Sequence, residues 1–309
     1  VVRNPGIVDF RDPKVTWYEP DKKWIMTLAT KDRITFFSSK NLKEWTKESE
    51  FGEQLGAHTG VWECPDLFPM NYNGETIWIL IVSIGDGGPN GGSATQYFTG
   101  HFDGQKFIVS DSTIKWIDYG PDNYAGVTWS NTGDRKIFLG WMSNWRYASR
   151  VPTVKWRSAM TIPRDLSLEK IDGKYFIKSI PVPELKTLSK NKTGKSITPS
   201  MPINNLALEL DGPTMLSFSL PHPQSFTLTF TNNENEKLMV GFDSAANQYF
   251  IDRTQAGDTS FASEFAGRHI VPRLSYEKEL KLTLVIDNSS IELFGDDGVS
   301  VMTSIFFPQ

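Results

Sequence analysis

The sequence is poor in the residues that build disulfides and metal sites. Its 309 residues include one cysteine and four histidines. A single cysteine excludes an internal disulfide framework. The histidines, His58, His101, His222 and His269, show no metal-ligand spacing. We therefore expect the protein to use neither a metal nor another cofactor.

Long apolar runs and an excess of positive charge are also missing. No apolar segment approaches the roughly 20 residues that cross a bilayer, and the opening VVRNPGIVDF is not a signal peptide. The net charge of -4 leaves no basic field over the surface. We expect no membrane span and no nucleic-acid partner. Because the chain does not open with methionine, we expect it to be a mature or trimmed segment.

Two common nucleotide and hydrolase motifs are absent. The glycine-rich stretch GDGGPNGGS, residues 85–93, opens no predicted helix and lacks lysine, which argues against a phosphate-binding loop. No Gly-x-Ser-x-Gly elbow for a serine nucleophile is present either. Any catalysis must therefore use other groups.

Aromatic side chains are abundant, at 13% of residues with ten tryptophans. Such residues pack sheets, and their flat faces also stack on sugars. Short runs rich in β-branched and aromatic residues, bounded by Asp, Asn, Gly or Pro, recur along the first half; examples are KVTWY, KWIMTLA, TIWILIVS and KIFLGWM. Helical periodicity is hard to find, so the sequence predicts an all-β protein.

A coarse repeat runs through this half. RDPKVTWY, ECPDLFPM and DYGPDNYAG each place an acidic residue beside a proline ahead of an apolar strand, at Asp12, Glu63 and Asp122. A period of roughly 40 to 60 residues is typical of the blades of a β-propeller. Because the innermost strands of the blades surround one axis, we expect these three carboxylates to be neighbours.

The second half has a different texture. A polar, Lys-rich and Pro-bearing stretch follows residue 180, and after it seven short strands are expected at the spacing of a β-sandwich. The predicted organisation is a propeller over 1–183, a linker over 184–197 and a sandwich over 198–309.

Glu63 is the best candidate for an acid catalyst. Trp62, Cys64 and Pro65 solvate charge poorly, so we expect them to surround the Glu63 carboxyl and to raise its pKa. Cys64 would serve as packing for the acid. The stretch is equally compatible with a surface glutamate beside a core cysteine.

Asp12 is the second carboxylate candidate. Pro13 favours an extended backbone for Asp12, and Arg11 alongside should keep the carboxylate ionised, ready to accept hydrogen bonds from sugar hydroxyls. Two carboxylates in different environments are the signature of glycoside hydrolysis. Taken alone, Arg-Asp-Pro more often marks a strand entry.

Aromatic residues near these acids could line a sugar pocket. Trp145 and Tyr147 follow a predicted strand in GWMSNWRYASRVP, and Tyr124 in GPDNYAG carries a hydroxyl that could modulate a neighbouring acid. Ordinary packing is the equal alternative for each.

Six motifs, in order, resemble glycoside hydrolase family 32, which includes invertases, inulinases and levanases. They are FRDPKV, WECPDLF, DYGPDNYAG, WMSNWRYA, WRSAMTIPRDLSL and IDNSSIELFGDDG. The resemblance implies a five-bladed β-propeller followed by a β-sandwich. It also implies retaining hydrolysis of β-fructosidic bonds in levan, inulin or sucrose by an exo-acting, secreted, periplasmic or cell-surface enzyme.

Residue roles follow from the same resemblance. Glu63 would be the general acid and base, and Asp12 the transition-state stabiliser. Arg11 and Trp145 would contact the fructose unit. Tyr124 and Cys64 complete the candidate substrate site on the grounds given above, namely a hydroxyl beside the acid and packing against it.

One family feature is missing from the sequence. The family's nucleophile is an aspartate in a Trp-Met-Asn-Asp-Pro-Asn-Gly motif, and the 309 residues contain nothing like it. We expect the N-terminal blades to be absent from this chain. The missing propeller segment, another part of the same protein, would then be its partner. The chain alone should then be inactive. A non-catalytic carbohydrate-binding protein of the same fold is the alternative, and an arabinan-acting five-bladed glycosidase is a third possibility.

Overall fold

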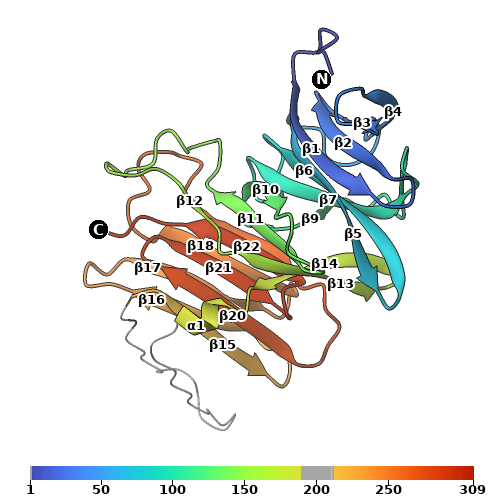
Figure 1. Ribbon diagram of the computed structural model, residues 1–309. Coiled ribbons are helices and arrows are strands. Elements are labelled where there is room, and N and C mark those ends of the chain that lie inside the picture. The colour runs from blue at the N-terminus through green and yellow to red at the C-terminus, as the bar shows by residue number, and fades with distance from the viewer. Residues whose placement is uncertain (1, 189–209, 211) are drawn as a thin grey trace.

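The protein is built from β-sheets in two lobes (Figure 1). The computed structural model describes residues 2–188, 210 and 212–309. The first lobe holds the propeller sheets and the second the β-sandwich, which confirms the predicted all-β class and architecture. The single helix in the described part of the chain is the short α1 (Leu185–Leu188).

Three antiparallel sheets make up the propeller lobe, with the main strands of each in chain order. The first sheet contains β1 (Phe10–Tyr18), β2 (Lys23–Thr30), β3 (Ile34–Ser39) and β4 (Thr46–Phe51). The second contains β5 (Trp62–Tyr72), β6 (Glu75–Ile84), β7 (Ala94–Phe102), β8 (Phe107–Val109) and β9 (Lys115–Trp116). The third contains β10 (Tyr124–Thr128), β11 (Lys136–Met142), β12 (Ala159–Met160), β13 (Arg164–Ile171) and β14 (Lys174–Pro181).

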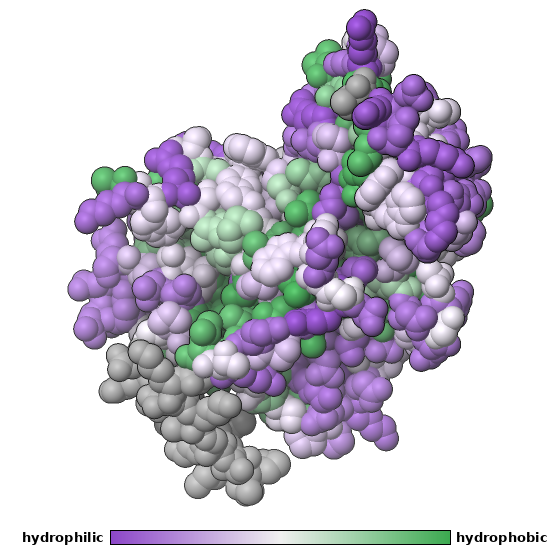
Figure 2. Space-filling view, viewed as in Figure 1, coloured by the Kyte–Doolittle hydropathy of each residue, from purple (hydrophilic) through white to green (hydrophobic). Residues whose placement is uncertain are grey.

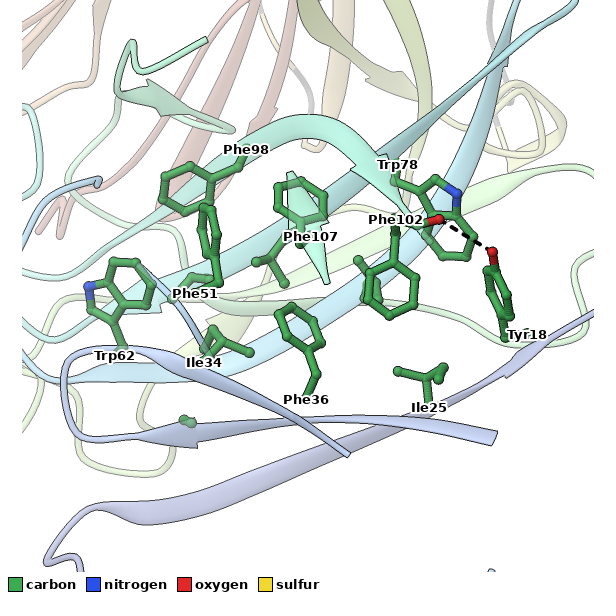
Figure 3. Close-up of a cluster of buried hydrophobic side chains, with 14 of the residues drawn as sticks. Tyr18, Ile25, Ile34, Phe36, Phe51, Trp62, Trp78, Phe98, Phe102 and Phe107 are labelled. Atoms are coloured by element: carbon green, nitrogen blue, oxygen red, sulfur yellow. Dashed lines mark hydrogen bonds between the residues drawn. The ribbon is translucent and has the colours of Figure 1, made fainter. Parts of the chain in front are cut away.

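The middle sheet is covered on both faces, which explains the unbroken apolar run of β6. Side chains alternate between the faces of a strand. Leu80 and Val82 therefore pack against the first sheet, whereas Ile79 and Ile81 pack against the third. Figure 3 shows the first of these interfaces, where aromatic rings from both sheets interlock and the Tyr18 hydroxyl points at the carbonyl of Phe102.

Two four-stranded antiparallel sheets form the sandwich lobe. One contains β15 (Thr214–Leu220), β20 (Leu280–Asp287), β21 (Ser290–Gly295) and β22 (Ser300–Ile305). The other contains β16 (Phe226–Thr231), β17 (Lys237–Asp243), β18 (Gln248–Gln255) and β19 (Arg268–Pro272). Their inner faces share one apolar core, to which β20 contributes every second residue from Leu280 to Ile286.

The first strand of each propeller sheet carries a bulge at the same place. The pairing register shifts after Arg11 in β1, after Glu63 in β5 and after Tyr124 in β10. The next residue has a positive φ in each strand: 57° at Asp12, 49° at Cys64 and 53° at Ala125. Arg11, Glu63 and Tyr124 are therefore structurally equivalent.

This finding corrects two expectations. The sequence repeat is real, but the equivalent residues are not Asp12, Glu63 and Asp122, because the bulge and not the acidic side chain is what repeats. Asp12 is also not extended: Pro13 excludes the right-handed helical region, and the bulge places Asp12 in the left-handed region.

Most of the linker predicted over 184–197, and the predicted start of the sandwich at 198, lie outside the described residues. Glu184, at the beginning of this stretch, forms an ion pair with Arg135 of the propeller lobe. The division into 1–183, 184–197 and 198–309 stays a prediction.

Buried ion pairs join the two lobes. Arg164 at the start of β13 is fully buried and binds Asp118 at 2.8 Å and Glu292 of β21 at 2.5 Å. Arg253 of β18 is equally buried and binds Asp122 at 2.6 Å. In the described ranges, no helix has the length and apolar character needed to cross a membrane.

Candidate active site

Three equivalent side chains from three sheets meet at one point. A guanidinium N–H of Arg11 donates to Glu63 Oε1 at 3.0 Å, and the Tyr124 hydroxyl donates to Glu63 Oε2. Arg11 also pairs with Asp9. Because these side chains occupy the same bulge position in three sheets, a cation, an acid and a phenol are brought together from residues far apart in sequence.

The surroundings of Glu63 differ from those expected. Trp62 is fully buried in the core between the first two sheets, because neighbouring residues of a strand point to opposite faces. The Cys64 thiol is directed at Asp12. The Glu63 carboxyl is thus held by two hydrogen-bond donors, and its side chain is 20% exposed.

Asp12 is bound by the strand that carries Glu63. Its Oδ2 accepts the backbone N–H of Cys64 at 3.0 Å and lies 3.7 Å from the thiol. Arg11 was expected to be its ionic partner, but that guanidinium binds Asp9 and Glu63. Burial raises the pKa of the Cys64 thiol to about 12, and the charges of Asp12 and Glu63 add to the shift. Cys64 therefore stays a neutral thiol between the two acids.

Tyr124, which binds the Glu63 carboxyl, belongs to a cluster of three aromatic rings. The Tyr124 and Trp145 rings lie 6.5 Å apart, and Trp141 lies 6.2 Å from Tyr124 and 5.0 Å from Trp145. Trp145 is 60% exposed, so part of its side chain is accessible to a ligand. Burial raises the pKa of Tyr124 well above its usual range, and the Glu63 charge acts in the same direction, which keeps the phenol a donor.

Two residues predicted near the acids are used elsewhere. Asp122 is fully buried and accepts hydrogen bonds from Arg253 at 2.6 Å and from the Tyr147 hydroxyl at 2.5 Å. Tyr147 packs in the interface between the lobes with Phe265. Both residues serve the junction with the sandwich, because an unpaired carboxylate at this depth would be costly.

Sequence reasoning missed Asp66, Lys14 and Trp141. Asp66 is 1% exposed and accepts the N–H and hydroxyl of Thr128, each at 2.7 Å, while Lys14 Nζ lies 3.5 Å away. Burial raises the pKa of Asp66, and Lys14 opposes that shift. The sequence signal that could have identified Asp66 is its place as an aspartate at the start of the apolar run DLFPM. Trp141, in an alternating strand, gave no such signal.

No metal-binding group is evident in the part of the chain that the structure describes, where no three His, Cys, Asp or Glu side chains are suitably grouped. The arrangement instead combines a carboxyl group, fixed by a cation and a phenol, with an exposed indole. On a propeller followed by a sandwich, these features define a protein of the carbohydrate-active class.

The chain belongs to glycoside hydrolase family 32. The family's N-terminal domain model matches residues 1–179, and its C-terminal model matches residues 184–309. Levanase of Bacillus subtilis (strain 168) is 42% identical over 324 residues, covering 100% of this chain and 48% of the levanase. An extracellular exo-inulinase of Aspergillus niger is 36% identical, covering 97% of this chain and 60% of the inulinase.

A solved structure supports the fold. The crystal structure of exo-inulinase from Aspergillus awamori superposes with a TM-score of 0.83 at 32% identity, covering 97% of this chain and 62% of that one. The chain thus spans about half of the levanase, at 48%, and somewhat more of the inulinases.

Proposed function

We propose that the protein is a fructan hydrolase. It would cleave β-fructosidic bonds in levan, inulin and sucrose with retention of configuration, acting from the chain end and releasing fructose. Membership of family 32 and the names levanase and exo-inulinase among its relatives support this proposal. The word extracellular in the name of the Aspergillus relative supports a secreted, periplasmic or cell-surface location.

The single observation that carries the proposal is the Arg11–Glu63–Tyr124 cluster. Glu63 is proposed as the general acid that protonates the leaving oxygen and then, as a base, activates water. The two donors fix the carboxyl so that it meets the glycosidic oxygen in one orientation. Arg11 is also proposed to contact the sugar.

The neighbouring groups complete the proposed site. Asp12, oriented by the Cys64 N–H, would accept hydrogen bonds from fructose hydroxyls and stabilise the positive charge that develops in the transition state. Trp145 would stack on the sugar, and Tyr124 would form part of the wall. Cys64 would shape the pocket between the acids.

The nucleophile is proposed to come from another segment of the same protein. A retaining glycosidase requires a second carboxylate about 5 Å from the acid, and the family's Asn-Asp-Pro segment does not occur in these 309 residues. We therefore propose that the 309-residue chain alone is inactive.

The outer face of the first sheet is the proposed docking surface for that segment. Val15 and Trp17 of β1 are 39% and 40% exposed, and Trp17 pairs across the strands with Trp24 on the same face. Met26, the partner of Val15, is already buried on this face in a small cluster with Leu28 and Phe37. An apolar sheet face of this kind packs well against another sheet, as the opposite face of the first sheet does. We propose a further propeller sheet as its occupant.

Glu63→Gln tests the function. We expect the natural full-length protein to release fructose from levan, inulin and sucrose, and Glu63→Gln to lower kcat by about 10²- to 10⁴-fold without changing the thermal unfolding temperature. Glu234→Gln, an exposed change in the sandwich, is the matched control.

Three results would contradict parts of the proposal. Unchanged turnover in Glu63→Gln would remove Glu63 from its role. Turnover by the 309-residue chain would show that it needs no further carboxylate. Fructan binding without any turnover by the full-length protein would favour a non-catalytic carbohydrate-binding protein.

A further inference from the structure

The glycine-rich loop 85–93 connects β6 to β7 and is folded tightly on itself. The N–H of Gly88 donates to the carbonyl of Gly92 at 2.8 Å, and that of Gly91 to the carbonyl of Gly88 at 3.0 Å. Gly92 has a φ of 76°, and a Cβ there would lie 2.1 Å from Oδ1 of Asn144. This glycine is therefore needed for close contact with the segment that carries Trp145.

Both ends of the loop bind the residues around Trp145. The hydroxyl of Ser93 accepts the backbone N–H of Trp145 at 3.2 Å. At the other end, Asp86 pairs with the guanidinium of Arg146 at 2.8 Å. Asn144, only 1% exposed, donates to the carbonyl of Gly91 at 3.1 Å. The backbone that presents the Trp145 indole is thus held by the loop.

The loop also contacts the chain just before Glu63. The N–H of Gly85 donates to the carbonyl of Val61 at 3.2 Å. At Gly60, a Cβ would lie 2.4 Å from the backbone nitrogen of Asp86, so the two segments touch through their backbones. The loop therefore bridges the start of β5, which carries Glu63, and the segment with Trp145.

Asn90 at the tip fastens this bridge to the sandwich. Its amide nitrogen donates to the carbonyl of Ile270 in β19 at 2.8 Å, and its amide oxygen accepts the N–H of Ile270 at 3.1 Å. The nitrogen also donates to the carbonyl of Tyr119 at 2.6 Å. β19 is the edge strand of its sheet, so the Asn90 amide pairs with the free edge as a neighbouring strand would.

We propose that Asn90 is a positioning residue through which the β-sandwich fixes loop 85–93, and with it the Trp145 indole relative to Glu63. The inference rests on the proposed function, because Trp145 is taken as the surface on which the sugar stacks. It gives the sandwich lobe a part in substrate binding, although none of its residues contacts Glu63 in the described structure.

Asn90→Asp tests the positioning directly. The carboxylate would face the carbonyls of Ile270 and Tyr119 without a donor, which should detach the loop tip. The protein is labelled with fluorotryptophan, and the Trp145 fluorine resonance is assigned with the Trp145→Phe variant. We expect this resonance to shift or broaden in Asn90→Asp. Most of the other nine tryptophans should keep their resonances. Asn233→Asp, an exposed change of the same charge in the sandwich, should leave Trp145 unchanged.

Kinetics of the natural full-length protein give the second readout. We expect Asn90→Asp to raise KM for fructan about tenfold with a smaller effect on kcat, since the binding surface and not the acid is displaced. If Asn90→Asp does not fold, Asn90→Ala removes the same hydrogen bonds without adding a charge.

The outcomes separate the two proposals. If the Trp145 resonance is identical in the Asn90 variants and in the unsubstituted protein, the positioning role is overturned, whatever the activity. If the natural full-length protein shows no turnover, the proposed function is overturned, and the resonance test still stands.

Discussion

At the scale of single residues, the site owes its character to how each charged group is paired. Glu63 binds a guanidinium and a phenol. Asp12 instead accepts the backbone N–H of Cys64, the residue that follows Glu63 in β5. Charge-assisted hydrogen bonds of this kind are stronger than neutral ones and fix orientation. Two carboxylates therefore lie close together in different environments, with the neutral Cys64 thiol between them.

The thiol itself offers a test of this arrangement. Because the pKa of Cys64 is raised to about 12, the folded protein holds almost no thiolate near pH 8. We expect iodoacetamide to leave the native protein unmodified and to alkylate it in concentrated urea, as measured by intact mass. One cysteine in the chain makes the mass change unambiguous. Rapid alkylation of the native protein would contradict the burial of Cys64.

The raised pKa of Cys64 also makes the stability of the folded protein fall as the pH increases. The pKa of the thiol rises from 9.0 to about 12 on folding, so the unfolded chain loses its proton first as the pH increases. The contribution of Cys64 to stability is complete below pH 9 and is lost between pH 9 and about 12.

At the scale of elements, the strands could be predicted from the sequence but the bulges could not. The alternation in β20 and the apolar run of β6 reflect which faces of each strand are buried, and the order of apolar and polar residues indicates this directly. A bulge depends on how a strand pairs with its neighbour, and Asp12, Cys64 and Ala125 share no side-chain chemistry. The motifs therefore identified Glu63, Asp12, Arg11 and Tyr124, whereas the hydrogen bonds that join Arg11 and Tyr124 to Glu63 emerged only from the strand pairing.

Gly126 follows the third bulge and is tightly enclosed. A Cβ at this position would lie 2.0 Å from the ring of Phe138, which is fully buried. We expect Gly126→Ala to lower the free energy of unfolding by about 1–3 kcal/mol, because the ring must move within a packed core. Gly85→Ala is the matched control, since nothing lies within 4 Å of its Cβ position. Urea unfolding measures both, and equal stability of the two variants would refute the crowding.

At the scale of the whole molecule, the two lobes are joined by charges buried from solvent. Figure 2 shows polar residues around the outer rim of this view and apolar residues toward the middle, where the lobes meet. Within that junction, Arg164 pairs with Asp118 and Glu292, and Arg253 pairs with Asp122. Sequence could not reveal these pairs, because their members are far apart along the chain and come together only when the sheets and the two lobes pack.

Removing one partner of these buried ion pairs should strongly reduce the stability of the fold. Arg164→Met leaves Asp118 and Glu292 buried without a cation, and we expect the free energy of unfolding to fall by about 3–5 kcal/mol. Combining it with Asp118→Asn and Glu292→Gln should restore part of the loss, because no charge is then uncompensated. Urea unfolding followed by tryptophan fluorescence measures the change. A loss below about 1 kcal/mol would mean that the pair is solvated.

The shared bulge has a consequence for how this site could diversify. Arg11, Glu63 and Tyr124 occupy one template position in three copies of a sheet, and the backbone around them is the same whichever side chain is present. Replacing the residue at that position alters the chemistry at the axis and leaves strand pairing intact. Duplicated sheets of this kind can therefore explore new catalytic combinations one residue at a time, each change being local to a single copy.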